Sequence, residues 1–304
     1  MPTSPPSETR TALLQLVAAE ILIGSVGVFA HEGGQDPVTT VFFRCAFGSA
    51  FLIAWGLLRG QFRGLMRERE LIGAAVFSGV LLVLNWVALF AGMARSSIGV
   101  ATMVYHFFPF AMLGFAAMLY GERTHPADLA WTAVAFLGVA LSTDPLKLLG
   151  RADASYAIGI GLTFVAALLC GASLLLSRRI SRERPLAVVL VQCLTGAAML
   201  APFTDYAAAA HVGPHWIWLA GLGLVHSGVC YVLFYSAYPR LSVATIAVLA
   251  FIYPLVALLL DYVLYGRALA PVQFAGIALI VLGTLGVNLK WHRARRPAPA
   301  PAAR

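Results

Sequence analysis

Ten long apolar runs, separated by short polar segments, constrain this chain more than any other feature. A helix needs roughly 20 apolar residues to cross the hydrocarbon core of a bilayer. Backbone N–H and C=O groups cannot stay unpaired in lipid, so continuous runs of this length favour helices over the short alternating strands of a barrel. We therefore predict an all-α integral membrane protein with ten transmembrane helices, at residues 11–30, 38–58, 71–92, 97–120, 126–144, 155–177, 186–203, 214–236, 242–265 and 269–290.

Composition supports the bilayer as the solvent. The chain is 60% hydrophobic and 11% charged, whereas charged residues make up about 25% of a typical soluble domain. The net charge of +8 does not indicate nucleic acid as a partner, because the basic residues lie in short clusters between apolar runs. The four cysteines fall inside those runs without a CxxC pair, so we expect neither a disulfide framework nor a metal site. No cofactor motif is present either.

The distribution of lysine and arginine predicts the orientation. With both termini inside, sixteen of the 21 basic residues fall in cytoplasmic segments and four in outer ones. Cytoplasmic loops of membrane proteins carry this excess of positive charge. We therefore predict a multi-pass protein of the cell (inner or plasma) membrane with both termini in the cytoplasm.

The two halves of the chain align with each other. Matched residues lie 145 positions apart in one part of the alignment and 148 in another: Arg95 and Arg240, Pro109 and Pro254, Tyr120 and Tyr265, Gly121 and Gly266, Pro126 and Pro271, then Pro37 and Pro185, Cys45 and Cys193, Gly48 and Gly196. Chance readily matches leucine and alanine among apolar helices, but not proline, glycine, tyrosine and arginine in one register. We predict repeats at residues 11–145 and 155–290, a linker at 146–154, and tails at 1–10 and 291–304.

Five helices per half is an odd number, so the second repeat must enter the membrane with the opposite orientation. Inverted repeats are typical of carriers whose site lies near the midplane of the bilayer, between the halves. The predicted architecture is thus two inverted five-helix repeats, 5+5, and it favours alternating-access transport.

The sequence from Ser96 to Pro109, followed by Y-G-E-R-T-x-P from Tyr120 to Pro126, returns around Pro254 and 265–271. This pattern resembles the EamA repeat of the drug/metabolite transporter superfamily, over residues 11–290. The resemblance implies a 5+5 carrier that moves amino acids, other metabolites or toxic cations, often outward. The second copy has Arg267 where the first has Glu122, so Arg267 cannot take over the role of Glu122.

The leading hypothesis is a secondary transporter that exports amino acids or related small metabolites. The alternative is a carrier of organic cations, such as quaternary ammonium compounds or drugs, with an acid and aromatic rings as its site. No Walker motif indicates direct coupling to ATP, and no H-E-x-x-H or paired intramembrane aspartates indicate an enzyme. A channel would need a ring of like charges or a filter-like polar loop, and neither is found.

Glu20 and Arg44 are ionisable residues inside predicted spans, where such groups are functional candidates. Two interpretations stay open. They can form a structural pair that ties neighbouring helices together, or they can face a cavity in which Glu20 binds a proton or a substrate ammonium. Their counterparts 148 positions later are Leu168 and Gln192, so the two repeats differ at these positions.

Pro109 and Pro254 lie in the middle of paired spans, where proline removes a backbone donor and bends the helix. We expect bends there that serve as gates or as static packing features. Aromatic residues with a few polar groups are the usual lining of a small-ligand pocket, and the candidates for substrate contact besides Glu20 and Arg44 are Asn85, Trp86, Tyr105, His106, His226, Tyr231, Tyr235, Phe251 and Tyr253. Glycines in the last span and its partner permit close helix contact or a homodimer.

Overall fold

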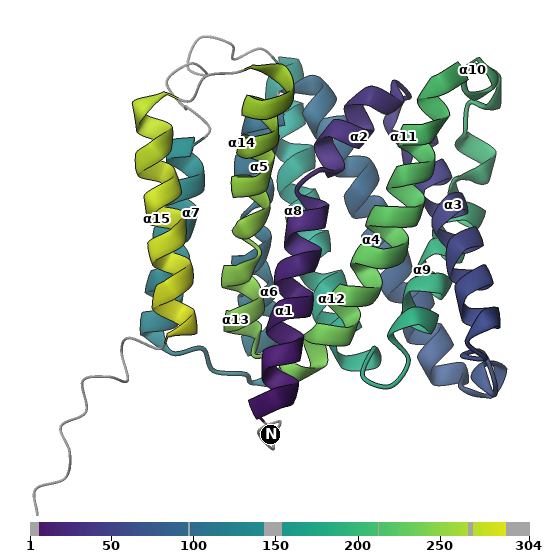
Figure 1. Ribbon diagram of the computed structural model, residues 1–304, viewed down its shortest axis with the longest axis horizontal. Helices are drawn as coiled ribbons and strands as arrows, with labels where there is room; N and C mark the ends of the chain where they lie inside the picture. The colour runs from purple at the N-terminus through teal and green to yellow at the C-terminus, as the bar shows by residue number, and fades with distance from the viewer. Residues whose placement is uncertain (1–5, 97, 143–153, 212, 267–269, 290–304) are drawn as a thin grey trace, which may run out of the picture.

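The computed structural model describes residues 6–96, 98–142, 154–211, 213–266 and 270–289, and these form an all-α bundle (Figure 1). No strand occurs within those ranges. Most of the predicted linker and the predicted tail at 291–304 lie outside the described residues. The first helix begins at Pro6, inside the predicted N-terminal tail.

The helices of the first half follow the predicted runs. They are α1 (Pro6–Ile23), α2 (Val26–Gly33), α3 (Pro37–Leu58), η1 (Leu65–Arg67), α4 (Arg69–Arg95), α5 (Ile98–Tyr105), α6 (Phe108–Tyr120) and α7 (Pro126–Ser142). The start of α3 shows how the sequence sets a boundary. The Asp36 side chain accepts hydrogen bonds from the backbone N–H groups of Val38 and Thr39, and Pro37 takes the first helical position, where its missing N–H has no intrahelical partner to lose.

The second half repeats this order with more interruptions. Its elements are α8 (Ala154–Ile180), α9 (Pro185–Leu200), η3 (Ala201–Phe203), α10 (Tyr206–Ala210), η4 (Gly213–His215), α11 (Trp216–Gly221), the π-helix η5 (Leu222–Cys230), α12 (Tyr231–Ala237), η6 (Tyr238–Arg240), α13 (Val243–Leu249), α14 (Ile252–Tyr265) and α15 (Pro271–Asn288).

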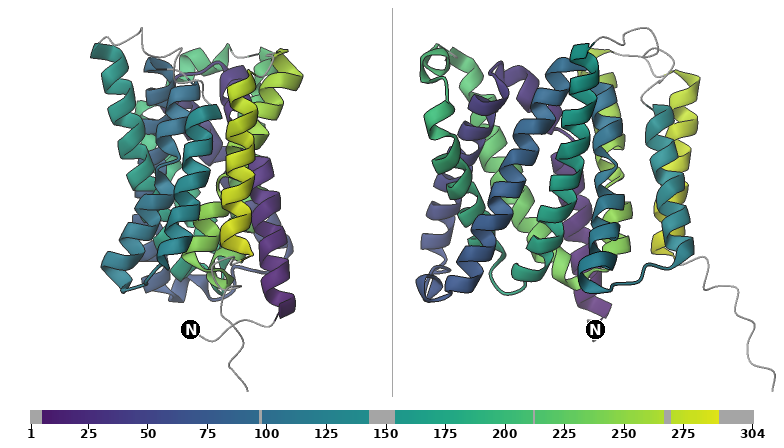
Figure 2. Two further views of the ribbon diagram at one scale, coloured as in Figure 1. Left: turned by 90° about the vertical axis from the view of Figure 1, so that its left-hand side faces the viewer. Right: turned by 180° about the vertical axis from the view of Figure 1, so that it is seen from behind.

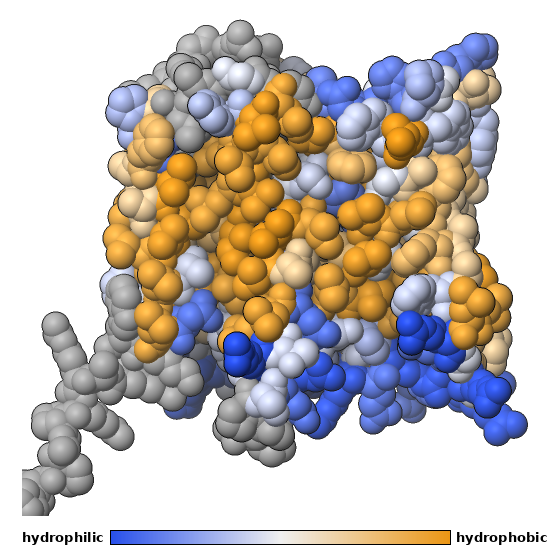
Figure 3. Space-filling model, in the orientation of Figure 1, coloured by the Kyte–Doolittle hydropathy of each residue, from blue (hydrophilic) through white to orange (hydrophobic). Residues whose placement is uncertain are grey.

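Nine helical segments of the described chain are long and apolar enough to cross a membrane. The tenth predicted span is the shorter helix α7, 17 residues long, which packs along α15. On the face shown in Figure 3, apolar side chains form a broad band across the middle of the molecule, and polar side chains gather at its two ends. The chain is therefore a multi-pass helical membrane protein.

Three spans are broken inside the bundle. The first is interrupted between α1 and α2, where the Ser25 hydroxyl donates to the carbonyl of Leu22. The others are interrupted between α5 and α6 and between α13 and α14. Pro109 is the second residue of α6, and Pro254 is the third residue of α14. Each proline therefore stands in the first turn of a new helix, where no intrahelical acceptor awaits its N–H.

Helices of the two halves pack against each other in pairs, α4 with α8, α3 with α9, and α7 with α15 (Figure 2). Glycine allows the closest approaches. A Cβ on Gly196 of α9 would lie 2.6 Å from the Cys45 sulfur of α3, and a Cβ on Gly138 of α7 would lie 2.6 Å from the Gly276 carbonyl oxygen of α15. The described chain begins and ends at the same face of the bundle (Figure 1).

Candidate functional site

A cavity of about 70 Å³ lies between the halves. Six of the predicted site residues line it: Glu20, Arg44, Trp86, Tyr105, Tyr231 and Tyr253. They come from α1, α3, α4, α5, α12 and α14, so distant segments of sequence meet here. The volume is small beside the roughly 300–1,000 Å³ of typical ligand pockets. A metabolite would therefore need the surrounding helices to move apart.

Arg44 is the buried cation of this cavity, with 1% of its surface exposed. Its Nε donates to the Ser227 hydroxyl at 2.9 Å, and its guanidinium carbon lies 3.8 Å from the centre of the Trp86 ring. Trp86 is held in turn, because its indole N–H donates to the Tyr231 hydroxyl at 3.2 Å. The Nη2 atom of Arg44 is buried and has no hydrogen-bond partner among the described residues. An unused donor on a permanently charged group is costly to bury.

Glu20 supplies the opposite charge. It lies in α1, one turn before the break at Gly24 and Ser25, and it is 4% exposed. Within the described residues, its carboxylate forms no hydrogen bond and no direct ion pair with Arg44. Both side chains instead line the same cavity. In this conformation the direct pair that one interpretation expected is not formed.

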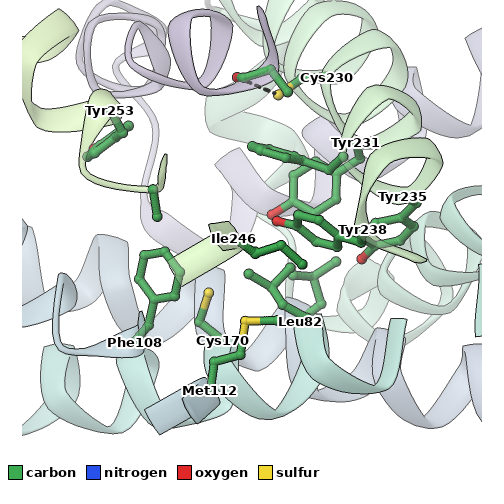
Figure 4. Close-up of a cluster of buried hydrophobic side chains, with 14 of the residues drawn as sticks. Leu82, Phe108, Met112, Cys170, Cys230, Tyr231, Tyr235, Tyr238, Ile246 and Tyr253 are labelled. Atoms are coloured by element: carbon green, nitrogen blue, oxygen red, sulfur yellow. Dashed lines mark hydrogen bonds between the residues drawn. The ribbon is translucent and has the colours of Figure 1, made fainter. Parts of the chain in front are cut away.

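The aromatic wall is larger than the sequence indicated. Phe108, Cys170, Phe234 and Tyr238 line the cavity together with the predicted tyrosines. Figure 4 shows Tyr231 and Tyr238 lying across from Phe108 and Cys170. Neighbouring rings pack edge to face, as for Tyr231 and Phe234, whose centres are 5.7 Å apart. These contacts make the wall rigid and apolar except for its hydroxyl groups.

Three predicted residues lie behind the wall and do not line the cavity. Asn85 is fully buried, and its amide donates to the Leu82 carbonyl at 3.4 Å. The Nδ1 atom of His106 lies 2.6 Å from the Thr102 carbonyl oxygen, and the His106 ring stacks on Tyr253 with centres 5.1 Å apart. Phe251 is fully buried in the core. Asn85 and His106 are thus next to cavity residues in sequence, but they do not line the cavity themselves.

Two more predicted residues, His226 and Tyr235, also lie outside the cavity wall. The Nε2 atom of His226 lies 2.9 Å from the Ser25 hydroxyl at the break in the first span. The Tyr235 hydroxyl donates to Gln192 Oε1 at 2.8 Å, so this tyrosine belongs to a second polar cluster.

That second cluster centres on Gln192, the counterpart of Arg44 in the alignment of the two halves. The Gln192 amide N–H₂ donates to the hydroxyl groups of Ser78 at 2.7 Å and Ser177 at 2.9 Å. With the bond from Tyr235, three of its four hydrogen-bonding positions are used. A buried network satisfied to this degree stabilises one packing arrangement.

Arg178 joins the two halves from the last turn of α8, the helix end that lies at the end of the bundle where α1 begins (Figure 1). Its Nη1 lies 2.8 Å from Glu122 Oε1, and its Nε and Nη2 donate to the Leu241 carbonyl. Glu122, which the repeat alignment marked as unmatched, therefore forms half of an ion pair. Towards the opposite end, a second cavity of about 320 Å³ lies between α2, α3 and α4 and shares Phe90 with the central one.

The comparisons with known proteins agree with this architecture. A model of the EamA-like transporter family matches residues 10–143 and again residues 157–289. The uncharacterized transporter YxxF of Bacillus subtilis (strain 168) is 29% identical over 93% of this chain and 91% of its own length. A probable terminal-alkyne amino-acid exporter of Streptantibioticus cattleyicolor is 27% identical over 77% of each chain. A known crystal structure has the same fold, with a TM-score of 0.77 at 22% identity over 94% of this chain and 99% of that one.

A bundle of apolar helices from two halves, with a cavity lined by Glu20 and Arg44 between them, defines a multi-pass helical membrane protein. The family model covers most of the chain in two copies. The chain belongs to the EamA-like transporter family.

Proposed function

We propose that this protein is a secondary transporter that exports amino acids or closely related small zwitterions. The observation that carries the proposal is that Arg44 lines the same cavity as Glu20, and that its buried Nη2 donor has no hydrogen-bond partner in the described chain. A carboxylate is the group best matched to a guanidinium with free N–H donors. An ammonium group matches Glu20.

This arrangement can bind a zwitterion with both charges compensated. The carboxylate of the substrate would accept from Arg44, and its ammonium would lie against Glu20. Apolar residues such as Ile23, Val26 and Leu89 complete the lining, so the substrate side chain would contact them through apolar groups. The relative named as a probable amino-acid exporter supports the same substrate class.

The organic-cation alternative is less well supported by the contacts. An aromatic cage binds a cation on the face of its rings, but the Trp86 face is already covered by the Arg44 guanidinium at 3.8 Å. That fixed positive charge would also repel a second cation in a low-dielectric cavity. A ligand with a carboxylate avoids both problems.

We propose alternating access between two inverted five-helix repeats as the mechanism, with α7 as the tenth span and both termini in the cytoplasm. Three observations support it: the family model matches twice, helices pack pairwise between the halves, and spans are broken near the cavity. The contacts of Arg178 would close the cytoplasmic end in this state. Glu20 is the carboxylate available to exchange a proton during the cycle.

Counterflow in proteoliposomes tests the proposal. Vesicles loaded with unlabelled L-leucine, L-phenylalanine or L-threonine should accumulate the labelled form of the same amino acid, and tetraethylammonium should neither exchange nor compete. Vesicles containing the Arg44→Gln variant serve as the matched control. Exchange of tetraethylammonium without exchange of any amino acid would contradict the proposal and favour the cation carrier.

A further inference from the structure

A nine-residue π-helix, Leu222–Cys230, interrupts the span between α11 and α12. π-Helical turns are rare and often occur at functional sites. Ser227 contacts Arg44 of α3, Cys230 contacts α1, which holds Glu20, and His226 contacts Ser25 at the break that follows α1. None of the three lines the cavity itself. The segment is thus placed to position the site without touching a substrate.

The contact between Ser227 and Arg44 is the strongest of these. Ser227 is fully buried, and its hydroxyl accepts from Arg44 Nε at 2.9 Å. A guanidinium is planar and rigid, so one hydrogen bond at Nε and stacking on Trp86 together define the plane of the group. That plane then determines where the unpartnered Nη2 points.

Close packing explains why a serine occupies this position. A Cβ on Gly48 of α3 would lie 2.9 Å from the Ser227 Cβ, and a Cβ on Gly223 would lie 2.3 Å from the Phe47 Cβ. The backbones of α3 and the π-helix therefore nearly touch. A short side chain with a hydroxyl fits between them and still reaches Arg44, whereas a longer one would push the two helices apart.

The same π-helix also contacts the first span before its break and at the break. The Cys230 thiol donates to the Ala19 carbonyl at 3.2 Å, next to Glu20 in sequence, and His226 contacts Ser25 at the break. Residues of one segment therefore support the backbone near Glu20 and the side chain of Arg44. Their relative placement depends on the geometry of that segment.

We propose that Ser227 is a positioning residue that aims the Arg44 guanidinium at the substrate carboxylate and so determines selectivity for amino acids over amines. This inference rests on the proposed function. Removing the Ser227 hydroxyl leaves the charge of Arg44 in place, but the plane of the guanidinium can then rotate. Binding of a ligand that carries a carboxylate then weakens, and binding of a ligand that has only an ammonium and a side chain does not.

The test compares binding of an amino acid with binding of its decarboxylated amine. Purified protein in nanodiscs is titrated with the amino acid that exchanges fastest in counterflow, and the corresponding amine competes for the site (3-methylbutylamine for L-leucine, 2-phenylethylamine for L-phenylalanine). We expect Ser227→Ala to weaken amino-acid binding about tenfold, equivalent to about 1.4 kcal/mol, with the affinity for the amine unchanged. The matched control is Ser236→Ala, because Ser236 donates to Val232 in the same span and does not contact Arg44.

The outcomes separate this inference from the proposed function. If Ser227→Ala weakens the binding of the amino acid and of the amine equally, so that the ratio of the two affinities does not change, the role of Ser227 is overturned. The proposed function is then unaffected. A wild-type protein that binds the amine as tightly as the amino acid overturns the proposed function itself. Should Ser227→Ala lose its fold, Ser227→Gly removes the hydroxyl without adding an atom and is measured in the same way, with the same result expected.

Discussion

Arg44 and Gln192 occupy equivalent positions in the two halves of the chain, yet their surroundings are opposite. Gln192 is held by Ser78, Ser177 and Tyr235, and its hydrogen-bonding capacity is nearly exhausted. Among the described residues, Arg44 has one hydrogen bond, to Ser227, and a buried donor without a partner. One of the two equivalent positions therefore has a nearly complete polar network, and the other has an incomplete one beside a cavity.

The helices around these residues differ in the same way. The counterpart of Glu20 is Leu168, within the continuous helix α8, whereas the span that contains Glu20 is broken. The difference supports the proposal that the two repeats share a scaffold and that divergence at few positions set the Arg44 and Glu20 positions apart as the site. Four variants test this division between site and scaffold.

The largest effect is expected from Arg44→Gln, which gives the first half the same residue that the second half has at the equivalent position, Gln192. Loss of a buried, charged hydrogen-bonding partner costs about 2–5 kcal/mol, so amino-acid counterflow should fall about 30-fold or more. The measurement is the initial rate of counterflow, with size-exclusion chromatography as the check on folding. Folded protein that keeps a tenth of its activity would show that Arg44 does not bind the substrate.

Glu20→Gln removes the negative charge and keeps the shape of the side chain. A hydrogen bond to a charged group contributes about 1.5–3 kcal/mol, so amino-acid transport should fall about tenfold or more. If Glu20 also exchanges protons, the remaining transport loses its response to an imposed pH gradient. Transport that is unchanged in rate and in its response to the gradient would remove Glu20 from the site.

Gln192→Leu should act on stability instead of selectivity. It removes the Gln192 partner of the Ser177 and Tyr235 hydroxyl groups, whereas Ser78 keeps its bond to the Ala75 carbonyl. Each unsatisfied buried group costs about 1–3 kcal/mol. We expect a clear drop in the melting temperature of the purified protein, with the preference for amino acid over amine retained. A change in that preference with no change in melting temperature would place Gln192 in the site and break the comparison.

The smallest effect is expected at Gly138, away from both positions. Gly138→Ala places a methyl group about where it would meet the Gly276 carbonyl oxygen, and overpacking of this kind costs about 1–3 kcal/mol. Gly161→Ala is the matched control, because no atom outside its own helix lies within 4 Å of that position and alanine favours a helix. Thermal melting should separate the two variants. Equal stability would mean that α7 and α15 can move apart freely.

Much of the fold could be predicted from the sequence, because a bilayer leaves few ways to satisfy the backbone of a long apolar run. The sequence also placed bends at Pro109 and Pro254, close to two of the breaks. The break at Gly24 and Ser25 and the π-helix could not be predicted. The run around Gly24 and Ser25 is as apolar as its neighbours, and nothing in Leu222–Cys230 marks it as π-helical apart from its glycines. Both features depend on tertiary contacts such as the one between Ser25 and His226.

The sequence predicted which helices surround the candidate site, but it did not predict which face of each helix turns towards the cavity. Successive residues of a helix point about 100° apart, so of Asn85 and Trp86 only Trp86 reaches the cavity, and of Tyr105 and His106 only Tyr105. A helix that is apolar all round gives no signal for which face turns inward. Ser227 was missed for a further reason, since a single serine in an apolar run has no pattern.

The π-helix also affects how this chain can be compared with its relatives. Its hydrogen bonds reach one residue further than those of an α-helix, so it holds an extra residue that a regular helix of the same span lacks. Deleting one residue within Leu222–Cys230 would turn the segment before it by about 100° relative to Tyr231. A relative without that extra residue can align a serine with Ser227 and yet point it away from its arginine.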